Sequence, residues 1–287
     1  MRNALSIDVE EYFQVSAFSK TVRTEDWPAH ESRVFQSTQT ILELLGEHGL
    51  KATFFFVGWV AERHPDLVRQ VDAAGHEIAS HGFAHQLVTS QTPEQLAQDI
   101  GRSLDILEDI VGRKVVGYRA PSYSITPQTA WALDVLSSLG LGYDSSVFPI
   151  YHDLGGFPGA PRHPYQINQD LWEIPLTTCR MWKWTLPVGG GGYLRLYPYA
   201  LTRWAIRKLN AGGIPAVVYV HPWEFDPNQP RIDGVSLLSR LRHYQNLNRT
   251  ATNLGSLCRD FEFAPLKTVL EDWIGVHEHG KDSNDHG

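Results

Sequence analysis

Two histidines, His81 and His85, stand four residues apart directly after the strand-like run 77–80. A tight loop or a single helical turn would bring both imidazoles to one side, where they could bind the same divalent cation. The spacing alone is weak evidence, because a chain with 13 histidines in 287 residues contains roughly 0.6 such pairs by chance. The metal interpretation therefore depends on other ligand-type residues along the chain.

Ionisable side chains recur wherever a predicted strand ends. Apolar runs at residues 4–7, 52–57, 76–80, 115–118 and 216–220 are typical of short strands. The polar residues at or just past the ends of these strands, or in Asp144's case just after Tyr143, are Asp8, Glu10, His81, Arg119, Asp144 and His221.

Helical patterns separate these strands. The predicted helices cover residues 31–48, 59–74 with a break near Pro65, 92–112, 126–140, 198–209 and much of 234–260, and residues 261–270 are predicted as a final strand. Alternation of strands and helices predicts a parallel sheet or barrel. In a (β/α) barrel the strand ends meet at one rim, so the six polar residues should form one site. Six unrelated structural residues are the simpler alternative.

Residues 148–197 break this alternation. They contain several prolines, a predicted strand at 171–175 and a glycine run at 189–192. We expect an irregular insertion of loops and short strands before the last barrel strand. The glycines form either a flexible turn or a close approach of the backbone to a ligand. The whole of residues 1–275 is predicted as one domain, and the polar tail 276–287 as disordered.

Composition argues against several other classes of protein. The net charge is −7 and no run of basic residues occurs, so a nucleic-acid partner is not expected. The two cysteines, Cys179 and Cys258, lack metal-ligand spacing and do not suggest a disulfide framework. No apolar stretch has the length of a signal peptide or a membrane span, which by default predicts a cytoplasmic protein.

The motifs together resemble the polysaccharide deacetylase family, also called the NodB-homology or carbohydrate esterase family 4 group, over about residues 3–270. Residues 6–13 (SIDVEEYF) and 231–234 (RIDG) resemble the subfamily found beside exopolysaccharide loci with PEP-CTERM sorting systems. The resemblance implies a distorted, incomplete (β/α) barrel. It also implies removal of acetyl groups from N-acetylated glycans with one divalent metal, zinc or cobalt for example.

The resemblance assigns roles residue by residue. Asp8 matches the catalytic base, and His81 and His85 match the metal-binding histidines. The usual carboxylate ligand position is Val9, which cannot bind metal, so Glu10 is the expected ligand, with Glu11 or Asp8 as alternatives.

Further roles come from the other motifs. Arg119 should keep Asp8 ionised, and His221 should protonate the leaving amine after being oriented and charged by Asp144. A backbone N–H of Ser122 or Tyr123 should stabilise the oxyanion. The side chains expected to contact the glycan are Tyr123, Trp182 and Trp223, with Trp172 and Trp184 as further members of an aromatic wall.

A cation held by two neutral imidazoles and one carboxylate keeps open positions and can activate water and polarise an acetyl carbonyl. The resemblance suggests work on an exopolysaccharide or its lipid-linked precursor, with peripheral contact at the inner face of the membrane. The oligomeric state is not predicted.

Three other functions compete with this one. A metal-independent or small-molecule amidohydrolase could use the same fold, since some relatives hydrolyse ring amides. A glycan-binding protein with a decayed site would explain Val9. A glycosidase with paired carboxylates would leave the histidine pair unexplained, and both carboxylates would come from one loop.

Overall fold

The computed structural model describes residues 1–152 and 155–282. Its main sheet has the strand order β10-β1-β2-β3-β4-β5-β7-β6, with β11 paired to the start of β1. All the pairings are parallel except that between β6 and β7. The strands are β1 Asn3–Val9, β2 Thr53–Phe56, β3 Glu77–Ser80, β4 Gly117–Tyr118, β5 Tyr143–Asp144, β6 Tyr165–Gln166, β7 Trp172–Glu173, β10 Val217–Val220 and β11 Phe263–Ala264.

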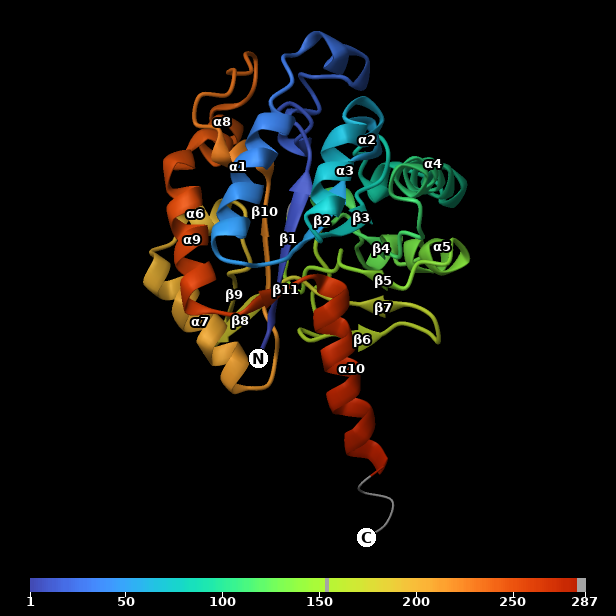
Figure 1. Ribbon diagram of the computed structural model, residues 1–287, viewed down its shortest axis with the longest axis vertical. Coiled ribbons are helices and arrows are strands. Elements are labelled where there is room, and N and C mark those ends of the chain that lie inside the picture. Colours follow the sequence, from blue (N-terminus) through green and yellow to red (C-terminus); the bar gives the residue numbers. More distant parts are fainter. Residues whose placement is uncertain (153–154, 283–287) are drawn as a thin grey trace.

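Apolar sequence explains the centre of this sheet. All seven residues of β1 and all four of β2 are buried, as expected for strands that are covered on both faces. Helices cover the outside of the sheet, and α10 projects beyond it at the end opposite to that towards which β1 points (Figure 1). The α-helices are α1 Val34–Glu47, α2 Gly58–Arg63, α3 Pro65–Ala73, α4 Pro93–Val111, α5 Ala132–Ser138, α6 Gly192–Leu196, α7 Tyr199–Ala211, α8 Leu237–Tyr244, α9 Thr250–Asp260 and α10 Leu266–Asp282.

Short 3₁₀ helices occupy several loops. They are Ser16–Phe18, Thr24–Ala29, Val88–Ser90, Pro121–Tyr123, Pro127–Thr129, Pro222–Phe225 and Leu247–Arg249. Two of them, Pro121–Tyr123 and Pro222–Phe225, follow β4 and β10 directly and carry residues of the predicted site.

The sheet curls into an open half-barrel. The two ends of its strand order, β10 and β6, do not pair with each other among the described residues. The expected incomplete (β/α) barrel is therefore confirmed, and the carboxyl ends of β1, β3, β4 and β10 gather at one rim.

Residues 148–197 are more regular than expected. The predicted strand at 171–175 is present as β7, which extends the main sheet beside β5 and carries β6 with it. A separate hairpin follows, formed by β8 Thr178–Met181 and β9 Trp184–Pro187. Residues 153–154 of this segment lie outside the described part of the chain.

The break predicted near Pro65 in the helical segment 59–74 is present, since α2 ends at Arg63 and α3 begins with Pro65 at its first position. Other boundaries differ from the sequence prediction. The predicted final strand 261–270 is only the two residues of β11, and α10 starts at Leu266. This helix runs on to Asp282, so the prediction of disorder is wrong for residues 276–282, and 283–287 lie outside the described residues.

The glycine run at 189–192 lets two backbones approach closely. The Tyr219 N–H donates to the Gly189 carbonyl at 2.7 Å, and the Gly191 N–H donates to the Tyr219 carbonyl at 2.9 Å. Gly190 has φ +141°, and a Cβ there would collide with the Tyr219 carbonyl oxygen. The run is thus required by contact with the end of β10, and Gly191 and Gly192 also line the pocket described below.

We expect Gly190→Ala to lower the free energy of unfolding by about 2–4 kcal/mol, because the new Cβ meets backbone atoms that cannot move aside. Gly101→Ala is the matched control. A Cβ at Gly101, inside α4, meets nothing within 4 Å, so this change should stabilise the protein by up to about 1 kcal/mol. Denaturant unfolding measures both, and equal effects of the two variants would contradict the proposed reason for the glycine.

Candidate metal and catalytic site

The histidine pair lies in a loop that β3 delivers to the rim. Gly82 and His85 have positive φ values of 71° and 50°. Asp99, on α4, holds this loop by accepting the backbone N–H groups of Phe83 at 2.8 Å and Ala84 at 3.0 Å. The loop places the His81 and His85 rings 5.1 Å apart, so the sequence spacing works through a tight turn and not through a helix.

Glu10 completes a three-residue cluster with the two histidines. One ligand-type atom from each of Glu10, His81 and His85 lies within 4.8 Å of the others, and all three residues are buried. Glu11 is excluded from the cluster, since its carboxylate accepts the Arg33 N–H at 3.0 Å and the Ser32 hydroxyl outside the main pocket. Asp8 is held by Arg119. Of the three carboxylates considered as metal ligands, Glu10 is therefore the best candidate.

The hydrogen bonds of His81 leave one ring nitrogen for a ligand. Its Nδ1 lies 2.7 Å from the Arg119 carbonyl oxygen, which can only accept, so Nδ1 carries the proton and Nε2 has a free lone pair. Burial lowers the pKa of His81 to about 4, which keeps the ring neutral. A neutral imidazole of fixed tautomer is the form that binds a metal.

Two buried atoms of the cluster lack hydrogen-bond partners among the described residues. They are Oε2 of Glu10 and Nδ1 of His85. Oε2 lies only 2.6 Å from Nε2 of His85, yet these atoms make no well-aligned hydrogen bond. Two nitrogens and one oxygen that converge in this way fit a divalent cation such as zinc, which would satisfy the carboxylate oxygen.

Arg119 and Asp8 form a fully buried ion pair beside this cluster. Nη1 of Arg119 donates to Oδ1 of Asp8 at 2.7 Å, as the sequence analysis expected. The other carboxylate oxygen, Oδ2, accepts the Tyr123 hydroxyl at 3.4 Å and lies 3.9 Å from Nε2 of His221. Asp8 therefore has one oxygen bound to the arginine and one directed into the pocket.

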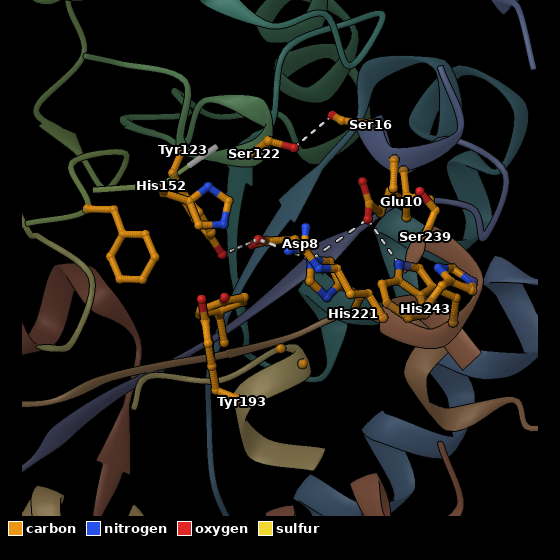
Figure 2. A pocket seen from close by; sticks show the side chains of 18 of the residues that line it. Asp8, Glu10, Ser16, Ser122, Tyr123, His152, Tyr193, His221, Ser239 and His243 are labelled. Carbon is orange, nitrogen blue, oxygen red and sulfur yellow. Dashed lines mark hydrogen bonds and ion pairs between the residues drawn. The ribbon is translucent and has the colours of Figure 1, made fainter. Parts of the chain in front are cut away.

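His221 faces the two carboxylates from the end of β10. Its Nε2 lies 3.8 Å from Oε1 of Glu10, and Figure 2 shows Asp8, Glu10 and His221 directed into the same space. The indole N–H of Trp223 donates to that same Oε1 at 3.0 Å. The Trp223 ring stacks between His221 and His243, at centroid distances of 5.0 and 4.1 Å.

The partner of His221 is Glu224, not Asp144. Nδ1 of His221 lies 2.7 Å from Oε1 of Glu224, and Arg195 donates to Oε2 at 2.6 Å. Burial acts to lower the pKa of His221, but the hydrogen bond to Glu224 and the charges of Glu10, Glu224 and Asp8 outweigh it and raise that pKa to about 9. His221 is thus held as a cation with its Nε2–H towards the pocket.

Asp144 has a different environment from the expected one. Its Oδ1 accepts the Ser146 hydroxyl at 2.5 Å, and Glu173 on the neighbouring strand is buried with it. Burial raises the pKa of both carboxyl groups. Asp144 does not line the pocket, so the role predicted for it passes to a residue that the sequence analysis missed.

Glu224 and Arg195 were missed because neither follows a predicted strand directly. A sequence clue exists for Glu224, since it stands three residues after His221 in the segment His-Pro-Trp-Glu. A residue three positions beyond the start of a helical turn folds back on that start, and Glu224 does accept the His221 backbone N–H at 3.1 Å. No local pattern identifies Arg195, which comes from the insertion.

The pocket above these residues has a volume of about 490 Å³. Ser122, Tyr123 and Trp223 line it as predicted. Trp182 does not: it is 93% exposed at the turn of the β8–β9 hairpin, and Trp184 is 72% exposed nearby. Trp172 does not line the pocket either, and the insertion contributes Phe148, Tyr151, His152, Tyr193 and Leu196 to the pocket instead.

The two backbone N–H groups proposed for the oxyanion differ. That of Tyr123 donates to the Ala120 carbonyl at 3.1 Å. Ser122 adopts a left-handed conformation with φ 51° and lines the pocket. Ser122 is the better candidate of the two.

Comparisons with known proteins agree with this geometry. Residues 27–143 match the family model "Polysaccharide deacetylase", and residues 145–271 match a "Domain of unknown function" model, DUF3473. The chitooligosaccharide deacetylase of Azorhizobium caulinodans is 34% identical over 105 residues, which are 36% of this chain and 49% of that protein. The chain spans between 36% and 49% of the length of the first curated relatives that it matches.

Solved structures share the fold. One, from Mycobacterium smegmatis and provisionally described as a polysaccharide deacetylase, has a TM-score of 0.63 at 21% identity and covers 94% of this chain and 88% of its own. PuuE allantoinase has a TM-score of 0.62 at 16% identity, with coverage of 96% and 90%. The fold alone is thus compatible with more than one amide hydrolase.

The first of the two matched regions contains His81, His85 and Arg119, and the second contains Arg195, His221 and Glu224. One pocket therefore draws on both. Residues 27–143 thus match the polysaccharide deacetylase family, and the chain shares its fold with the M. smegmatis structure over most of its length.

Proposed function

We propose that the protein hydrolyses the N-acetyl groups of an N-acetylated glycan. The observation that carries this proposal is the convergence of Glu10, His81 and His85 beside Asp8 and His221 at the base of one pocket. Two carboxylates, two neutral imidazole ligands and one cationic histidine can together perform metal-assisted amide hydrolysis. The similarity to a chitooligosaccharide deacetylase supports a chitin-like N-acetylglucosamine substrate.

Each residue has a defined part in the proposed mechanism. A divalent cation at Glu10, His81 and His85, which we propose is zinc, would supply Lewis-acid activation of water and of the acetyl carbonyl. Asp8, which pairs with Arg119, would accept the proton of the attacking water. The Ser122 N–H would donate to the oxyanion, and His221, oriented by Glu224, would protonate the amine as it leaves.

The finer assignment concerns the source of the glycan. The resemblance of residues 6–13 and 231–234 to the subfamily of exopolysaccharide loci supports an exopolysaccharide or its lipid-linked precursor as the substrate. It also supports action in the cytoplasm at the inner face of the membrane. In the described part of the chain, no helix is long and apolar enough to cross a bilayer.

A small-molecule amidohydrolase is the competing proposal, since the fold is equally similar to that of an allantoinase. The deciding experiment is acetate release from N-acetylglucosamine oligomers by the purified protein, with and without added zinc or cobalt. Allantoin is the parallel substrate. Acetate release that depends on the metal supports the deacetylase, whereas ring opening of allantoin without acetate release would replace it.

The metal site predicts different behaviour of two adjacent glutamates. Glu10→Gln should lower the affinity for zinc by about tenfold to a hundredfold, because an anionic ligand is lost. His81→Ala should abolish binding at this site. Metal content is measured by elemental analysis after dialysis against dilute zinc.

Glu11→Gln is the matched control for Glu10→Gln, since the Glu11 carboxylate is directed away from the cluster towards Ser32 and Arg33. It should retain zinc like the wild type. Loss of zinc in this variant together with retention in Glu10→Gln would reverse the ligand assignment.

If His221 is the proton donor, removing it should lower the catalytic rate without affecting metal binding. His221→Ala should keep the metal but lower kcat by about a hundredfold to ten-thousandfold, as for the removal of a general acid. Glu224→Gln should lower kcat in the same direction and by less, with KM nearly unchanged, because His221 loses the anion that orients and charges it. Steady-state kinetics on metal-loaded protein test both.

Asp144→Asn serves as the comparison for Glu224→Gln, since Asp144 lies outside the pocket. If Asp144→Asn reduced kcat more than Glu224→Gln at equal metal content and equal folded fraction, His221 would depend on Asp144 after all.

A further inference from the structure

Helix α8 presents an apolar face to solvent. Leu237, Leu238 and Leu241 are 73%, 57% and 53% exposed. These positions lie within about 100° of one another around the helix axis. On the opposite side His243 is buried against Trp223. The His243 side of α8 therefore packs against the rest of the protein, whereas the side formed by the three leucines is exposed to solvent. We call this exposed side the leucine face.

Arginines stand on both edges of the leucine face. In helical projection Arg240 lies to one side of the three leucines and Arg242 to the other, and both are exposed. The segment 231–249 contains four arginines and a single acidic residue, Asp233, which gives it a net charge of +3. The whole chain has a net charge of −7, so this segment is basic whereas the chain as a whole is acidic.

The other side of α8 contributes to the catalytic pocket. Ser239, Arg242 and His243 line that pocket; in helical projection Ser239 and His243 lie opposite the leucine face and Arg242 lies at its edge. Leu196 of α6, which is 45% exposed, lines the pocket too. Arg195 ties α6 to the end of α8 by donating to the carbonyl oxygens of His243 at 2.9 Å and Gln245 at 2.7 Å. The leucine face therefore belongs to a helix that borders the pocket, and it points away from the pocket.

A second exposed apolar group borders the same mouth. Tyr151 lines the pocket and is 91% exposed. Its neighbour His152 lies across the pocket from Ser239 (Figure 2). Figure 1 places α8 at the end of the molecule towards which β1 points. The pocket residues Asp8 and His221 lie at this end too, near the end of β1 and just past the end of β10.

We propose that the leucine face of α8 docks on an anionic phospholipid bilayer. Leucines directed outward between two arginines match an interfacial helix, whose apolar side chains enter the acyl boundary while the cations reach the phosphates. The basic charge of residues 231–249 complements the negative surface. This deepens the membrane contact within the proposed function, but it depends on neither the metal nor the reaction.

The test is flotation of the full chain with vesicles of phosphatidylcholine, with and without phosphatidylglycerol. The wild type should float with the anionic vesicles, and less so at high salt, since screening weakens the arginine contribution. The triple variant Leu237→Ser, Leu238→Ser, Leu241→Ser should lower the bound fraction by about tenfold or more, because three apolar side chains no longer enter the lipid.

Trp182→Ser is the matched control. Trp182 is even more exposed than the leucines, but it lies on the β8–β9 hairpin away from the pocket, so vesicle binding should not change. Binding of the wild type to neither kind of vesicle, or full binding by the triple variant, would overturn the proposal. So would a wild type that is dimeric by light scattering and a triple variant that is monomeric, since the leucine face would then join two copies of the chain.

The same variants separate this proposal from the enzymatic one. None of the three leucines lines the pocket, so the triple variant should release acetate from a soluble oligomer at the wild-type rate. Loss of vesicle binding with intact hydrolysis supports the surface. Inactive wild-type protein that still floats with anionic vesicles would leave the surface standing and remove the proposed reaction.

Discussion

A single buried cation, the guanidinium of Arg119, connects the sheet to the site. It donates to Asp8 and Ser6 on β1 at 2.7 Å each, and to the carbonyl and hydroxyl oxygens of Ser145 after β5 at 3.0 and 2.9 Å. It also lies 4.2 Å from the centre of the Phe55 ring on β2. Since an unpaired buried charge costs several kcal/mol, these partners must all be present, and they hold the curl of the half-barrel.

The same residue prepares the chemistry. Its side chain fixes one oxygen of Asp8, and its backbone carbonyl fixes the tautomer of His81. The two site histidines thereby come to differ: burial keeps His81 neutral, whereas Glu224 and the nearby carboxylates keep His221 charged. Neighbouring groups of one residue type with pKa values shifted in opposite directions are what a ligand and a proton donor need within one pocket.

The second matched region of the chain, residues 145–271, supplies residues of the site itself. It contributes the insertion that lines one side of the pocket, the His221–Glu224–Arg195 chain of contacts, and α8. Arg195 is central here, because one buried guanidinium binds Glu224 and also the end of α8. The His221–Glu224 pair and the end of α8 are therefore joined through one side chain.

Much of this could be predicted from residues that act locally. Thr92 and Gln95 form a capping box at the start of the helix predicted over residues 92–112, and Gly112 ends α4 in the left-handed conformation. The apolar run of β2 is a buried strand, and polar residues after successive strands do meet at one rim, because parallel strands must end on the same side. Short-range rules predicted the break near Pro65, but they failed in residues 261–270, where only Phe263–Ala264 form a strand and α10 begins at Leu266.

The pattern of strand ends in the sequence was sufficient to indicate a parallel sheet or barrel with Asp8, Glu10, His81, Arg119 and His221 at one rim, and the family resemblance implied the incomplete barrel and a metal site. Only the tertiary structure decided among partners. It places Glu10, and not Glu11, beside the two histidines, and it pairs His221 with Glu224 and not with Asp144. It also lines the pocket with Tyr193 and Leu196 and not with Trp182. These choices depend on which side chains face one another across the curled sheet, and such contacts join residues far apart in the chain, where periodicity and spacing carry no information.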